Sequence, residues 1–108
     1  MLPPKIKRKS DKADEGKRSV AHRAWVRGHA CSACGSQEAI ECAHVRTGTD
    51  GGTGIKPSDR WCISLCKPCH SLQHTVGERS FSERYGIDMR KMAEAFFKAS
   101  PHRAKLER

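Results

Sequence analysis

The chain has 108 residues, of which 31% are charged and 6% aromatic, and it carries a formal net charge of +9. That length fits one domain with a short tail, and no apolar run is long enough to span a membrane. The positive charge favours nucleic acid as a partner, although solubility or a ribosome-like or membrane-surface role would also account for it.

The first 17 residues are expected to form a flexible basic arm ahead of a domain over residues 18–108. Pro3 and Pro4 block regular structure, and few apolar residues accompany the basic ones. Such an arm either contacts phosphates without sequence preference or is a solvated tail. No apolar core of a signal peptide is present in Met1–Lys5, so we expect a cytoplasmic protein.

The first half of the domain is predicted to hold one helix and one cysteine knuckle. The helix spans Ser19–Arg27, with Val20, Ala24 and Arg27 on one side and Gly28 as its stop. The knuckle Cys31–Cys34 follows and is closed by a glycine, which leaves backbone N–H groups free to face the thiolates.

Two strands and a helix are predicted next. The strands span Ala39–Val45 and Arg60–Leu65, pair antiparallel, and are joined by a glycine-rich loop over residues 47–54. The second strand delivers the second C-x-x-C and a helix over Lys67–Val76, ended by Gly77. The predicted fold class is therefore small α+β, a ββα unit with a zinc at its base.

A last helical stretch over Phe81–Ser100 breaks at Gly86 and ends at Pro101. Its apolar residues are spaced for one helical face, which predicts core cover rather than a cofactor site. They are Met89, Met92, Ala93, Phe96 and Phe97.

The two C-x-x-C pairs have the residue types and internal gaps of a tetrahedral zinc site. The 31 residues between the pairs exceed the roughly 15–20 of a zinc ribbon, and the glycine-rich loop supplies the surplus. In a cytosolic chain, such pairs favour zinc over disulfides. We therefore predict one structural Zn²⁺ held by Cys31, Cys34, Cys66 and Cys69.

The histidines predict a second metal. His70 and His74 are four residues apart on the predicted helix, so their imidazoles share one face and could reach one ion. His44 ends the first strand, where antiparallel pairing would bring it near that ion. A neutral imidazole is suited to take a proton from water, and a metal opposite it would stabilise the charge of a phosphodiester cleavage.

These residues resemble the HNH (ββα-metal, or His-Me finger) endonucleases. The closer similarity is to small phage and prophage members, including the RecA-activated recombination-enhancement nucleases. It covers roughly residues 20–90. The matching segments are residues 22–28, 31–35, 41–46, 51–61, 65–66, 69–70, 74, 77–81 and 86–88.

The resemblance implies roles for several residues. His44 would be the general base, and His70 and His74 would bind a catalytic divalent metal (Mg²⁺, Mn²⁺ or Zn²⁺). Asp59 falls near the central Asn of the family motif, where it would either fix the loop that orients His44 or bind the metal. Ala43 stands where relatives often carry a metal-binding Asp or His, so the third ligand is open: Asp59 first, then Glu41 or water.

The remaining polar residues receive weaker assignments. Arg46, Lys56 and Arg60 border the glycine-rich loop, where they either grip a nucleic-acid backbone or are solvated. Cys42 and Cys62 are interpreted as buried small hydrophobes rather than ligands. The other three histidines lack ligand spacing and receive no role.

The sequence thus predicts a metal-dependent DNA endonuclease or nickase of a bacterium or phage-infected host. The resemblance adds a recombinase filament as a partner. No membrane partner is expected, because no apolar run is long enough to span a bilayer. The alternative is a non-catalytic zinc module that binds nucleic acid or a protein, which needs the cysteines and the charge but neither His44 nor His74.

Overall fold

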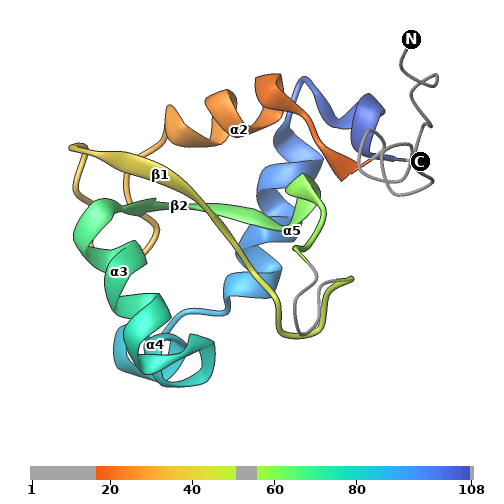
Figure 1. Cartoon of the computed structure of the whole chain (residues 1–108). Helices are drawn as coiled ribbons and strands as arrows, with labels where there is room; N and C mark the ends of the chain where they lie inside the picture. The colour runs from red at the N-terminus through yellow and green to blue at the C-terminus, as the bar shows by residue number, and fades with distance from the viewer. Residues whose placement is uncertain (1–16, 51–55, 108) are drawn as a thin grey trace, which may run out of the picture.

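An antiparallel pair of short strands lies at the centre of the fold (Figure 1). The computed structural model describes residues 17–50 and 56–107. The expected basic arm, apart from Lys17, and residues 51–54 of the glycine-rich loop lie outside these ranges. β1 (Ile40–His44) pairs with β2 (Cys62–Cys66), with His44 opposite Cys62. The expected antiparallel pairing is confirmed.

The second strand begins two residues later than expected. Asp59–Trp61 forms a 3₁₀ turn, η1, in which the Ser58 side chain accepts a hydrogen bond from the Arg60 N–H. That cap holds the backbone in a helical turn, so the prediction of strand at residues 60 and 61 was wrong. Every residue of β2 is buried, as expected for a strand covered on both faces.

α2 (Val20–Arg27) packs against both strands. Ser19 caps it by accepting from the His22 N–H, and Gly28 ends it. The expected extent is confirmed, but the predicted apolar face was wrong. Val20 is 69% exposed, whereas His22 and Val26 are buried. Its Nδ1 lies 2.8 Å from Ser100 Oγ, whereas its buried Nε2 has no hydrogen-bond partner among the described residues.

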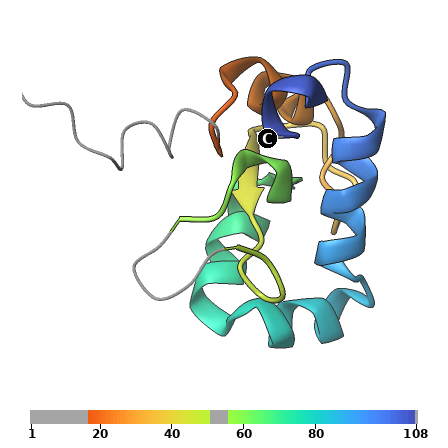
Figure 2. The same cartoon turned by 90° about the vertical axis from the view of Figure 1, so that its right-hand side faces the viewer.

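Three helices follow the second strand. α3 (Lys67–Val76) has the predicted bounds, and α4 (Glu78–Tyr85) and α5 (Met89–Ala99) are separated at Gly86 as predicted. Gly77 and Gly86 have φ of +87° and +63°, which only glycine adopts without strain. In Figures 1 and 2, α2 lies along one side of the strand pair, α3 and α4 along the other, and α5 packs against β2.

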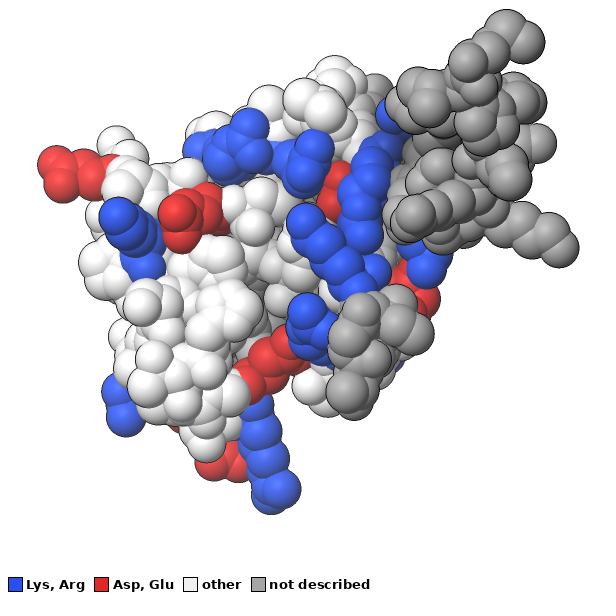
Figure 3. All heavy atoms as spheres, viewed as in Figure 1, with Lys and Arg blue, Asp and Glu red and all other residues white. Residues whose placement is uncertain are grey.

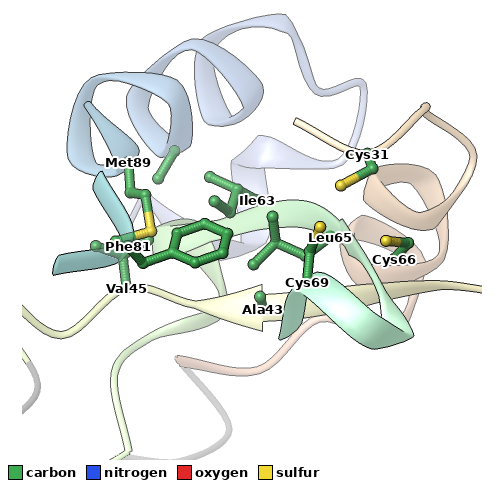
Figure 4. Close-up of a cluster of buried hydrophobic side chains, with 10 residues drawn as sticks. Cys31, Ala43, Val45, Ile63, Leu65, Cys66, Cys69, Phe81 and Met89 are labelled. Carbon is green, nitrogen blue, oxygen red and sulfur yellow. The ribbon is translucent and has the colours of Figure 1, made fainter. Parts of the chain in front are cut away.

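Buried side chains from both strands and from α3 to α5 form the core (Figure 4). Ile63 and Leu65 of β2 face Phe81 of α4 and Met89 of α5. Three cysteine side chains continue this core at the end where α3 begins. The residues that were expected to hold zinc therefore close one end of the core. None of the described helices is long and apolar enough to cross a lipid bilayer.

The buried His22 makes the fold sensitive to acid. Burial lowers its pKa, outweighing the charge of Asp59, which raises it. A lowered histidine pKa contributes stability above the ordinary value of 6.5, which is lost as pH falls through the folded value. Urea unfolding should show wild type losing more stability than His22→Gln from pH 7 to 5.5, by at most about 1.4 kcal/mol per pH unit. Equal losses would contradict this assignment.

Candidate metal centre and adjoining pocket

The four cysteines of the two C-x-x-C pairs lie together, as predicted. Their sulfur atoms are all within 4.8 Å of one another, and the Sγ atoms of Cys34 and Cys66 are 3.6 Å apart. Sulfurs bound at about 2.3 Å around a tetrahedral zinc would lie roughly 3.8 Å apart. The cluster could therefore hold a zinc ion with little rearrangement.

Local backbone structure sets this arrangement. The Gly35 N–H donates to the Cys31 carbonyl, and Gly35 takes a φ of +78° that closes the knuckle. On the other side, Cys66 caps α3, and Cys69 lies in the first turn of that helix. The Ser32 N–H donates to the Ser64 carbonyl at 2.8 Å, which holds the knuckle against β2 just before the junction with α3.

The thiol groups differ in their readiness to ionise. Burial would raise the pKa of Cys31, but backbone hydrogen bonds from Cys34, Cys66 and Ala33 outweigh it and lower the pKa to about 6. Burial and the neighbouring thiols raise the pKa of Cys69. A cation among the four sulfurs would replace the protons of the remaining thiols, as zinc does in sites of this kind.

His70 and His74 lie side by side on α3. Their Nε2 atoms are 3.1 Å apart. Two nitrogens about 2.1 Å from one ion would be separated by roughly 3.0–3.4 Å, so the pair fits one shared metal. Without an ion, the two nitrogens share a hydrogen bond.

Glu41 contacts the other ring nitrogen of His70. Its Oε1 lies 2.9 Å from His70 Nδ1, so it is placed to accept the Nδ1 proton. That proton position leaves the His70 Nε2 lone pair available to a metal, an arrangement common for metal-binding histidines. The structure thus brings Glu41 to the histidine pair, but on the nitrogen that faces away from His74.

His44 is held by Asp59 rather than by the histidine pair. Its Nε2 lies 2.8 Å from Asp59 Oδ1. The fully buried Asp59 side chain also accepts from the Ser19 N–H at 2.8 Å and contacts Arg18 at 3.1 Å and Arg23 at 3.3 Å. Burial would raise the pKa of Asp59, but hydrogen bonds from His44 and Ser19 and the charge of Arg23 lower it.

The three candidates for a third ligand are therefore placed differently. In the described part of the chain, no hydrogen bond or ion pair joins Asp59 to His70 or His74. Asp59 contacts His44 directly, and Glu41 contacts His70 Nδ1. The identity of the third metal ligand stays a prediction.

A pocket of about 630 Å³ opens across β1, between α2 and α3. His44 and the pair His70 and His74 all line it, as does the Cys42 thiol. Its other lining residues are charged: Arg23, Arg27, Glu41, Arg46 and Lys56. Figure 3 shows basic side chains gathered on this face over α2, opposite a largely uncharged surface over α3.

Two of the pocket's basic residues were missed from the sequence, and one expected residue lies elsewhere. Arg23 and Arg27 are four residues apart on α2, a spacing that places them on one face and was available as a signal. Arg46 and Lys56 line the pocket. Arg60 instead stacks on Phe97, 4.2 Å from its ring centre, outside the pocket.

The fold and these clusters define a small α+β protein with a two-stranded sheet and a cysteine cluster able to bind metal. The chain belongs to the family described as "Protein of unknown function (DUF968)", which it matches over residues 3–101. Comparisons with curated proteins and with solved structures find no match.

Removing one cysteine from the cluster should release the zinc. Cys34 is exposed, so Cys34→Ser changes the ligand set with little effect on packing. We expect the dialysed variant to lose bound zinc, measured by elemental analysis, and to lose several kcal/mol of stability, since structural zinc contributes about 10–16 kcal/mol in zinc-finger peptides. The control Cys42→Ser should keep one zinc. A Cys34→Ser protein that keeps both its zinc and the wild-type stability would contradict the assignment.

Proposed function

We propose that the protein is a metal-dependent DNA endonuclease or nickase of the HNH (ββα-metal) type. The observation that carries the proposal is that His44 and the pair His70 and His74, which come from β1 and α3, line one basic pocket. A base and a metal-ligand pair facing the same space are the components that phosphodiester hydrolysis needs. The sequence resemblance to that nuclease group supports the same conclusion.

In this proposal, Asp59 prepares His44 to act as the general base. Asp59 has a lowered pKa and is ionised at neutral pH, so it can only accept a hydrogen bond. The proton of His44 therefore resides on Nε2, 2.8 Å from Asp59 Oδ1, and the lone pair resides on Nδ1. That nitrogen would take the proton from the attacking water.

Glu41 would orient the metal ligand His70 in the same way that Asp59 orients His44. By accepting the Nδ1 proton of His70, it presents Nε2 toward the Nε2 of His74, 3.1 Å away. Two histidine ligands leave positions open for the scissile phosphate. When bound, a divalent ion would stabilise the charge on the phosphate and on the leaving 3′ oxygen.

The basic side chains around the pocket support DNA as the substrate. Arg23 and Arg27 lie on the α2 side, and Arg46 and Lys56 complete the rim. Such contacts hold phosphates without reading sequence. A recombinase filament as activator is proposed from the resemblance alone.

The alternative is a zinc module that binds nucleic acid or protein without catalysis. It requires the four-cysteine cluster but gives His70 and His74 no metal. Metal stoichiometry separates the two functions. A second metal equivalent that is lost in the His70→Ala, His74→Ala double variant supports the nuclease, and one zinc in both proteins supports the module.

The test is nicking of supercoiled plasmid with Mg²⁺ or Mn²⁺, alone and with a recombinase filament. We expect His44→Ala to nick about 10²–10⁴-fold more slowly than wild type, the usual contribution of a general base. His102→Ala removes an exposed histidine outside the pocket and should nick at the wild-type rate. Equal nicking by His44→Ala and wild type would contradict the proposal, as would no nicking under any of these conditions.

A further inference from the structure

A third group of metal-ligating atoms surrounds His44. One ligating atom each of His44, Asp59 and Cys62 lies within 4.8 Å of the others. The sheet register explains the proximity, because His44 is directly opposite Cys62 and opposed residues of an antiparallel pair share a face. Asp59 joins them from η1, just before β2.

Cys42 and His44 mark the route by which an ion would reach this group from the pocket. Cys42 lies two residues before His44 on β1, so its side chain is on the same face. Cys42 and His44 both line the pocket, whereas Cys62 and Asp59 are fully buried behind them. An ion in the pocket would therefore meet Cys42 and His44 first.

We propose that His44, Asp59 and Cys62 form a second thiolate-containing site for Zn²⁺ or a similar thiophilic cation, and that its occupancy inhibits the enzyme. The claim that this site binds a metal depends on the geometry alone. The claim that the bound metal inhibits the enzyme rests on the proposed nuclease function, because it requires His44 to be the base.

Proton positions explain why such an ion would inhibit. As the Cys62 sulfur binds the cation, its S–H bond breaks and the proton leaves to water. The His44 proton moves from Nε2 to Nδ1, so that Nε2 can bind the cation. His44 then has no free lone pair for a water proton. Asp59 can turn Oδ1 to the cation while Oδ2 stays with the Ser19 N–H.

The same chemistry predicts which ions bind. Hard ions such as Mg²⁺ and Mn²⁺ prefer oxygen ligands, whereas Zn²⁺, Co²⁺ and Cd²⁺ favour a thiolate such as that of Cys62. The arginine charges beside Asp59 oppose a cation. The four-cysteine cluster therefore fills first.

Cobalt titration tests the binding directly. Protein with one zinc in the four-cysteine cluster is titrated with Co²⁺ under a metal-free reductant, and thiolate-to-cobalt charge-transfer absorption is recorded. The His70 and His74 site lacks sulfur and adds no such band. We expect a saturable band in wild type and in the His70→Ala, His74→Ala control, and its loss in Cys62→Ala and in His44→Ala.

Two variants, Cys62→Ala and His44→Ala, are used because they remove different ligands of the same proposed site. His44 is partly exposed, so His44→Ala remains informative if the fully buried Cys62 does not tolerate alanine. A band of wild-type intensity in the folded variants would overturn the site, because the cobalt would then be displacing zinc from the four-cysteine cluster. Absence of a band in wild type would overturn it as well.

Nicking assays with Mg²⁺ or Mn²⁺ and added Zn²⁺ test the inhibition. Cys62→Ala should nick at the wild-type rate without zinc and need at least about 10-fold more zinc for half inhibition, the lower range for loss of a metal-site partner. Equal zinc sensitivity in both proteins would overturn the inhibitory role. A wild type that shows the cobalt band but never nicks would instead refute the nuclease proposal and leave the metal site standing.

Discussion

The four-cysteine cluster is the constraint on which the rest of the structure depends. It joins a knuckle at residues 31–34 to the junction of β2 and α3, across 31 residues of intervening chain. Cys69 lies in the first turn of α3, and His70 is the next residue. A metal among the sulfurs would therefore fix both the start of α3 and the direction in which His70 and His74 point. Cys69 and His70, which are adjacent in the chain, would therefore bind two different metal ions.

A second constraint is the buried carboxylate of Asp59. It joins the start of α2, through the Ser19 N–H, to η1 and to the His44 side chain on β1. An ionised carboxylate without exposure to water requires such partners, and removing one would leave the charge uncompensated. Asp59 thus fixes the position of α2, which carries Arg23 and Arg27, relative to His44, the proposed base. The two sides of the pocket therefore keep one relative orientation.

Much of the fold followed from local signals. The bounds of α3 were predictable because Pro68 favours the first turn of a helix and Gly77 takes a conformation that ends one. The four-cysteine cluster was predictable because two C-x-x-C pairs have the residue types and internal gaps of a structural zinc site. The antiparallel pairing followed from the order of the two short strands.

The parts that could not be predicted depend on distant partners. His22 is buried against Ser100, 78 residues later, whose Oγ lies 2.8 Å from one of the two ring nitrogens, and no local pattern shows that pairing. The face of α2 was therefore assigned wrongly, and Arg23 and Arg27 were missed as lining residues. Glu41 was among the expected ligands, but which histidine nitrogen it contacts depends on how β1 and α3 pack.

The most direct test is a crystal structure of the protein grown with Zn²⁺ and Mn²⁺, with anomalous scattering measured at the absorption edge of each metal. The account predicts a zinc peak at the centre of the four cysteine sulfurs. It also predicts a separate metal peak between the Nε2 atoms of His70 and His74, with Glu41 on the far side of the His70 ring. A single zinc peak, with His70 and His74 still hydrogen-bonded to each other, would contradict the two-metal account.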